Sequence, residues 1–420
     1  MSRTWLLRLV IAFGFAQGAV SMARPAVTYR ALALGADERA VGVIAGVYAL
    51  LPLFAAVPLG RRTDHGRCAP LLPAGVGLIT GGCALSGTAG SLAGMAAWSG
   101  VMGLGHLCFV IGAQSIVARR SAPDEQDRNF GHFTIGASLG QLVGPVAAGA
   151  VVDGGDLAGT STPALLIAAG GCALALTSLW RVEVPRTPSD ARPGAGGGAA
   201  AGTGAAGAAA TGTGAAGAAA TGSGAARVPV HRILRSRGVP GGIFISLAVL
   251  SATDILTAYL PVVGEHRGIA PAAVGVLLSL RAAATIACRL VMTPLIAWLG
   301  RAVLTATTCL LAALACAAVA LPVPVWALAG ILVVLGFCLG VGQPLSMTTV
   351  VRAAPRDARS TALALRLTGN RLGQVAAPAS AGAVAAVAGT AAPFVMLGAL
   401  LLVASALAVR GRAAPEHGAA

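Results

Sequence analysis

The sequence contains no lysine, and few of its residues are charged or aromatic. All 29 basic residues are arginine and only 14 residues are acidic, while charged residues make up 10% of the chain and aromatic residues 4%. Hydrophobic residues account for 56%, and the mean hydropathy is +0.82. A chain of 420 residues cannot hide this much apolar surface from water by folding alone. A water-soluble protein is therefore excluded.

Motifs for ATP hydrolysis and metal binding are also absent. The chain has no GxxxxGK[ST] motif, so ATP does not drive its activity directly. It has no CxxC pair and no Cys/His metal spacing, and seven of its eight cysteines lie inside apolar runs, where cysteine packs as a small hydrophobe. We expect no metal and no cofactor. A membrane-embedded enzyme is the competing class, but helix-borne HExxH or paired acids are missing, so we expect no enzyme activity.

Apolar runs separated by polar breaks predict twelve membrane-spanning helices. Each helical crossing needs about 20 apolar residues, which leaves room for roughly a dozen. The first run resembles a signal peptide, but it continues beyond Pro25, so we expect it to remain as a helix. The predicted spans are residues 5–29, 41–59, 69–87, 91–117, 131–152, 163–180, 241–262, 272–299, 303–321, 325–350, 360–386 and 391–409.

The arginines are distributed unevenly between the two sides of these spans. A net charge of +15 is compatible with a nucleic-acid partner, but most arginines lie between apolar runs rather than on a soluble face. We therefore expect a lipid bilayer and no nucleic acid. With a cytoplasmic N-terminus, the outer loops hold only Arg30, Arg39 and Arg267. This positive-inside bias predicts a multi-pass protein of the cytoplasmic membrane with both termini in the cytoplasm.

A Gly/Ala-rich segment without charge divides the chain between the sixth and seventh spans. It repeats every ten residues at Thr203, Thr213 and Ser223, and glycine at this density favours a flexible tether. The predicted organisation is an N-terminal six-helix bundle (1–183), a flexible cytoplasmic linker (184–238) and a C-terminal six-helix bundle (239–420).

Short matches at one constant offset indicate that the two halves are repeats. The segment AVGV at 40–43 recurs at 273–276, and the pattern LGQ…P…GAV at 139–151 recurs at 372–384, an offset of 233 in both cases. Six spans per half in the same orientation is the parallel-repeat plan of secondary transporters. The predicted fold is therefore an all-α membrane protein of two pseudo-symmetric six-helix bundles.

The segment GRRTDHGR follows the second span. It resembles the signature of the major facilitator superfamily between the second and third helices, and the resemblance extends over nearly the whole chain apart from the tether. The resemblance implies the major facilitator fold, with spans one, four, seven and ten around a central cavity. Asp64 can accept charge-assisted bonds from a neighbouring helix, so Gly60, Asp64, Gly66 and Arg67 form a predicted cytoplasmic gate. A topogenic arginine cluster with a turn is the alternative.

The fifth span carries small residues and a proline on one face. This pattern resembles the fifth-helix motif of proton-coupled drug and metabolite exporters within that superfamily, here with Ala148 in place of a glycine. Small residues let two helices touch closely, and proline bends a helix. Close packing without an export role is the alternative. The motif residues are Gly131, Gly140, Gly144, Pro145 and Gly149.

Two titratable residues lie deep within predicted spans. Asp254 is the acidic residue placed deepest in the bilayer, and His106 lies near the middle of the fourth span. Ionisable residues inside a membrane are costly and are therefore candidates for function. We predict proton coupling through Asp254, with His106 as the second candidate. The alternatives are that Asp254 pairs with an intramembrane arginine and that His106 is a hydrogen-bonded packing residue.

Intramembrane arginines outnumber the one deep carboxylate, which favours a polar or anionic substrate because a guanidinium stays charged. The predicted function is secondary transport of a small organic molecule by a monomer, with proton-coupled efflux as the main hypothesis. Proton-coupled uptake or exchange of an organic anion is the alternative. Each polar residue below is also explained by helix-to-helix hydrogen bonding. The predicted cavity residues are Gln17, Tyr48, Gln114, Arg281, Gln343, Asn370 and Arg371.

Overall fold

The computed structural model describes residues 4–65, 70–121, 126–179, 230–236, 238–354 and 359–412. These residues form helices and no strands, apart from an isolated bridge between Asp153 and Asp156. The first half comprises α1 (Thr4–Ala33), α2 (Glu38–His65), α3 (Leu71–Thr88), α4 (Leu92–Arg120), α5 (Gln126–Val151), α6 (Leu157–Ala173) and the short α7 (Ala175–Ser178). The second half comprises the short α8 (Val230–Arg235), α9 (Val239–His266), α10 (Pro271–Leu299), α11 (Arg301–Ala320), α12 (Val325–Ala353), α13 (Arg359–Ala388) and α14 (Ala392–Arg412).

Eleven helices of the described residues are long and apolar enough to cross a membrane. The remaining long helix, α13, is more polar and carries Arg366 and Arg371. Large apolar side chains face outward around the molecule, and Trp298, Leu290 and Trp326 are each at least 79% exposed. Such an exposed apolar surface is stable in lipid and not in water.

Local sequence sets several helix ends. The side chain of Ser91 accepts a hydrogen bond from the Gly94 amide at the start of α4, and Asp156 accepts one from Gly159 at the start of α6. Both residues are favoured helix N-caps because they satisfy an otherwise unpaired amide. Gly300 ends α10 with a φ of 74°, a conformation that costs glycine little.

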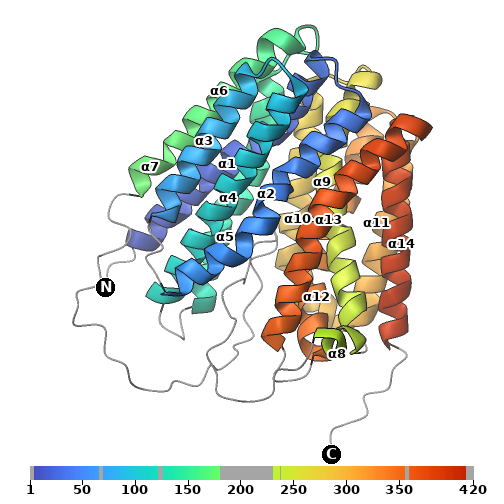
Figure 1. Cartoon of the computed structure of the whole chain (residues 1–420). Helices are drawn as coiled ribbons and strands as arrows, with labels where there is room; N and C mark the ends of the chain where they lie inside the picture. The colour runs from blue at the N-terminus through green and yellow to red at the C-terminus, as the bar shows by residue number, and fades with distance from the viewer. Residues whose placement is uncertain are drawn as a thin grey trace, which may run out of the picture.

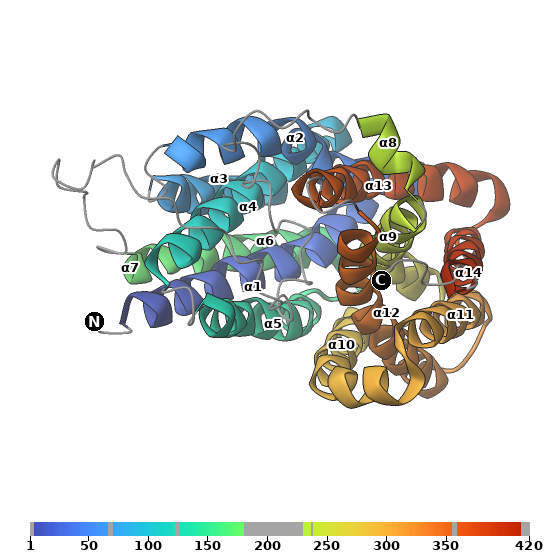
Figure 2. The ribbon, with the colours of Figure 1, turned by 90° about the horizontal axis from the view of Figure 1, so that it is seen from below.

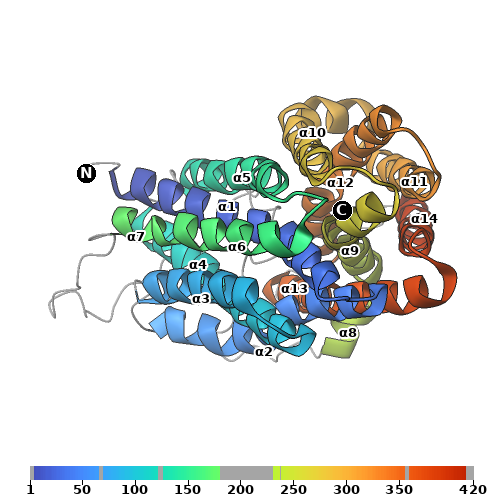
Figure 3. The same cartoon turned by 90° about the horizontal axis from the view of Figure 1, so that it is seen from above.

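The two halves repeat the same packing, as the sequence offset predicts. In the first half α1 packs against α5 and α6, and α4 packs against α2 and α3. In the second half α9 packs against α13 and α14, and α12 packs against α10 and α11. The two bundles lie side by side when the molecule is viewed from either end (Figures 2 and 3). The prediction of two pseudo-symmetric helical bundles is confirmed.

The repeated sequence segments form the contacts between the halves. Gly42 on α2 lies so close to α13 that a Cβ there would overlap the Pro378 carbonyl oxygen. At the equivalent position on α10, a Cβ on Gly275 would overlap the carbonyl oxygen of Pro145 on α5. The phenol of Tyr259 donates to the Glu38 carbonyl at 2.8 Å in the same region. These contacts lie near the α1–α2 and α9–α10 connections, at the end of the molecule opposite the start of α1 and the end of α14 (Figure 1).

Several regions differ from the predicted element boundaries, and α6, for example, begins at Leu157 rather than at residue 163. Helix α2 continues to His65, whereas its span was predicted to end at residue 59, so Gly60 and Asp64 are helical. Gly66 and Arg67 lie outside the described residues, as does most of the predicted linker. The last part of that linker range forms α8, because the buried Ile233 packs in an apolar cluster with Val239 and Val350.

Candidate functional site

A cavity of about 100 Å³ lies between the two halves. Spans one, four, seven and ten were predicted to line it, and the corresponding helices α1, α4, α9 and α12 do so. Helices α2, α5, α10 and α13 line it as well. The polar lining residues are Gln17, Ser21, Arg24, Tyr48, His106, Gln141, Thr253, Asp254, Thr257, Arg281, Thr285, Arg289, Gln343, Arg371 and Gln374.

An ion pair crosses the cavity and joins the two halves. Arg24 on α1 lies 2.8 Å from a carboxylate oxygen of Asp254 on α9. The other carboxylate oxygen accepts a hydrogen bond from Gln374 at 3.1 Å, and Gln374 accepts one from Arg371 at 2.9 Å. Asp254 therefore neutralises Arg24, and its carboxylate has one partner from each half.

Three other arginines line the cavity from the second half. Arg281 and Arg289 lie eight residues apart on α10, on one face and about 12 Å apart along the axis. Their Nε atoms and Nη2 of Arg371 are buried without a hydrogen-bond partner. Because a guanidinium stays charged, these groups can bind an anion, and the planar fork favours a carboxylate or phosphate.

Gln343 lines the cavity but also holds a buried arginine. Its side-chain oxygen accepts a hydrogen bond from Arg366 at 2.7 Å, and its nitrogen donates to the Ser246 carbonyl at 2.8 Å. Arg366 also donates to Ser346 at 3.3 Å and does not line the cavity. These bonds connect α9, α12 and α13 within the second half.

The first half contributes a chain of hydrogen-bonded, uncharged side chains. The Tyr48 phenol lies 2.7 Å from Nδ1 of His106, and Nε2 of the same imidazole lies 3.1 Å from the Gln17 side-chain oxygen. Gln17 in turn donates to the Ser21 hydroxyl at 3.2 Å. Both ring nitrogens of His106 are thus hydrogen-bonded, and the side chain also lines the cavity.

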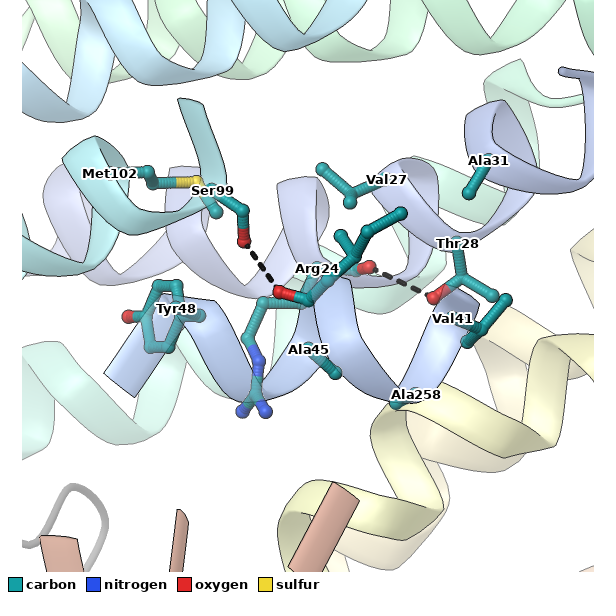
Figure 4. Close-up of a pocket in the computed structure, with 11 residues that line it drawn as sticks. Arg24, Val27, Thr28, Ala31, Val41, Ala45, Tyr48, Ser99, Met102 and Ala258 are labelled. Carbon is teal, nitrogen blue, oxygen red and sulfur yellow. Dashed lines mark hydrogen bonds between the residues drawn. The ribbon is translucent and has the colours of Figure 1, made fainter. Parts of the chain in front are cut away.

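A smaller cavity continues on the other side of Arg24 and Tyr48 (Figure 4). Its remaining lining is mostly apolar and includes Val27, Val41 and Met102. The Arg24 guanidinium carbon lies 5.3 Å from the centre of the Tyr48 ring, a cation–π contact. Arg24 and Tyr48 therefore border both spaces.

Two predicted cavity residues lie outside the cavity lining. Gln114 is half-buried on α4, and Asn370 is fully buried on α13 without a hydrogen-bond partner for its amide. Both lie on helices that reach the cavity through other residues, and sequence alone does not identify which polar residues of a mostly apolar helix reach it.

The fifth-helix motif residues are divided between two packing contacts and the cavity. Gly140 and Gly144 pack against α1, and a Cβ on Gly144 would lie 2.8 Å from the Gly18 carbonyl oxygen. Gly149 packs against Pro271 at the start of α10, and Pro145 lines the cavity. Gly131 lies near the start of α5.

Sequence reasoning underestimated several lining residues. Arg24, Gln141, Arg289 and Gln374 line the cavity but were not among the predicted cavity residues. A signal was present in the repeat, because Gln141 and Gln374 are related by the same offset of 233 residues, as are Tyr48 and Arg281. Equivalent positions in a repeat face the same central space.

Comparison with known proteins identifies the family. The family model described as Major Facilitator Superfamily matches residues 9–332 and 242–420. No curated protein sequence matches the chain. The crystal structure of the nucleoside transporter NupG is similar over 98% of this chain and 100% of its own, with 12% identity and a TM-score of 0.69. A bacterial homolog of the human lysosomal transporter Spinster, in an inward-facing and occupied conformation, is similar over 97% of this chain and 96% of its own, with 14% identity and a TM-score of 0.69.

A POT family transporter in complex with 5-aminolevulinic acid is also similar, over 96% of this chain and 95% of its own, with 14% identity and a TM-score of 0.69. At these identities the structures establish a shared fold. The family match extends over nearly the full chain, and the resemblance first noted at the Asp64 segment is confirmed. The chain therefore belongs to the Major Facilitator Superfamily and is a multi-pass secondary transporter rather than an enzyme.

Proposed function

We propose that this protein exports a small organic anion across the cytoplasmic membrane in exchange for protons. The observation that carries the proposal is the charge of the central cavity. Arg281, Arg289 and Arg371 line it without a carboxylate of their own, because Asp254 is paired with Arg24. An anionic ligand supplies the missing negative charge, and desolvated guanidinium groups bind carboxylates strongly.

Access to the cavity alternates between the two sides of the membrane. The contacts of Gly42 with α13 and of Gly275 with α5 close the end remote from the termini. With both termini in the cytoplasm, as the arginine distribution favours, this arrangement is inward-facing. Outward opening then requires α2 to separate from α13 and α5 from α10.

Asp254 is the proposed proton carrier, with His106 as the second candidate. The pair of Arg24 and Asp254 joins the halves, so protonation of the carboxylate removes an ionic contact between them. Proton uptake at Asp254 and movement of the halves are thereby linked. The Asp64 segment acts as a cytoplasmic latch in the outward-facing state.

Export as the direction rests on the resemblance of α5 to exporters. The cationic cavity alone suits uptake or exchange of an organic anion equally well, and this is the second candidate. The whole cavity is formed within one chain, which supports a monomer as the working unit.

Direction and substrate charge are tested together in membrane vesicles. Inside-out vesicles containing the protein should accumulate organic acids from a panel when a pH gradient is imposed, and a deletion strain should be sensitive to the same acids. Arg281→Gln should abolish accumulation, whereas Arg352→Gln, at an exposed position near the end of α12, should not. Accumulation of neutral or cationic compounds with no acid transported would overturn the proposal.

A further inference from the structure

We propose that the first-half wall of the cavity is a second subsite, which binds an uncharged hydrogen-bond donor on the transported anion through the Tyr48 phenol oxygen. The substrate is then an organic acid that carries a hydroxyl or amide N–H group away from its anionic group. This inference rests on the proposed function, because it requires the anionic group to bind Arg281 and Arg371.

Tyr48 and Arg281 occupy equivalent positions in the two halves. They are 233 residues apart, the offset that relates all the repeated segments. The packing beneath them is also equivalent: a Cβ on Gly103 would overlap the Tyr48 carbonyl oxygen, and a Cβ on Gly336 would overlap that of Arg281. The pseudo-symmetry therefore places the two side chains on opposite walls of one cavity, one a phenol and the other a guanidinium.

The charges of the two walls differ in the same way. Three arginines without a carboxylate partner come from α10 and α13. The polar lining of the first half is uncharged apart from Arg24, which Asp254 neutralises. A ligand that contacts both walls thus needs an anionic group on one side and a neutral polar group on the other.

The hydrogen-bond chain determines which kind of neutral group fits. The side-chain oxygen of Gln17 can only accept, so Nε2 of His106 carries a hydrogen and donates to it. The imidazole is neutral beside the cavity arginines because like charges repel, and its Nδ1 is then an acceptor. Tyr48 must therefore donate its hydroxyl hydrogen to Nδ1. Its oxygen keeps free lone pairs, so the phenol can accept a further hydrogen bond but cannot donate one. The neutral group of the ligand must therefore be a hydrogen-bond donor.

Binding of matched pairs of acids tests the subsite. The full-length purified protein is titrated with propionate and lactate, benzoate and para-hydroxybenzoate, and hexanoate and its ω-hydroxy derivative. These pairs vary the distance between the carboxylate and the hydroxyl. We expect the hydroxylated member of at least one pair to bind about three- to tenfold more tightly, the size of one hydrogen bond.

Tyr48→Phe removes the phenol oxygen and keeps the ring that contacts Arg24. It should abolish the preference, so that the hydroxylated acid and its partner bind with similar affinity. Tyr29→Phe is the matched control, because the Tyr29 hydroxyl is buried without a hydrogen-bond partner and does not line the cavity. That variant should keep the preference.

The outcomes separate this inference from the proposed function. Carboxylates that bind the wild type, weaken in Arg281→Gln and show no hydroxyl preference overturn the subsite alone. A preference for the hydroxylated acid that survives Tyr48→Phe would also overturn the subsite and leave the anion site standing. If no acid binds the wild-type protein at millimolar concentration, the anion site itself is wrong and the subsite with it.

Discussion

The two walls of the central cavity come from repeated halves of one chain, yet they differ in charge. The first half presents Gln17, Tyr48 and His106 in a hydrogen-bonded chain, while α10 and α13 of the second half present three arginines. The helices and their glycine contacts are equivalent in both halves. A repeated scaffold can therefore keep the symmetric contacts that closure needs while its cavity side chains diverge for binding.

Among the residues that the structure describes, the ion pair of Arg24 and Asp254 is the charged link between the walls of the cavity. Asp254→Asn should abolish uphill transport driven by a pH gradient, the largest effect we expect, because the proposed proton carrier is lost. Exchange of an acid at equilibrium needs no net proton movement and should persist. Transport of the tightest-binding acid of the panel in liposomes measures both. Asp153→Asn, in the exposed connection between α5 and α6, is the control. Uphill transport at the normal rate would assign Asp254 a structural role.

Making the two walls alike at one position tests their difference in charge. Arg281→Tyr places on α10 the side chain that α2 carries at the equivalent position. Affinity for carboxylates should fall about ten- to hundredfold, because a charge-assisted bond contributes about 1.5–3 kcal/mol. Calorimetric titration measures the change, and Arg352→Tyr serves as a control at an exposed site. Unchanged affinity would mean that the anion binds elsewhere.

The proposed cytoplasmic latch at the Asp64 segment allows a difference between the two halves to be tested outside the cavity. Asp64→Asn should shift the inward to outward ratio about ten- to a hundredfold, because it removes a charge-assisted contact of about 1.5–3 kcal/mol and 1.4 kcal/mol changes a ratio tenfold. Transport should fall while binding of the acid in the cavity survives. Accessibility of single cysteines from each side of the membrane reports the ratio. Unchanged accessibility would leave the Asp64 segment with a topogenic role only.

The symmetric part of the comparison is tested by the two contact glycines. Gly42→Ala and Gly275→Ala each introduce a Cβ that overlaps a carbonyl of the other half, so each should weaken closure by a similar amount, about five- to tenfold in the same ratio. Gly330→Ala is the control, because no atom lies within 4 Å of its added Cβ. A large effect at one glycine and none at the other would show that the two contacts are not equivalent in energy.

The candidate site was predictable in composition and less so in its pairings. Asp254, His106, Tyr48 and Arg281 were recognisable because polar residues inside apolar spans are costly. The partner of Asp254 was not recognisable, since several intramembrane arginines were available and only the packing of α1 against α9 brings Arg24 within 2.8 Å. Asn370 has the same polar character but does not line the cavity.

The sequence by itself determined the number of long helices, their division into two repeats and the excess of positive charge. These properties follow from composition and periodicity, because apolar runs must match the bilayer and the repeat offset is directly visible. Tertiary structure alone decided which arginine Asp254 neutralises, which residues line the cavity and where the two halves touch. Those features depend on contacts between residues far apart in the chain, and a helix that is apolar on all sides carries no local signal for the side that faces its partner.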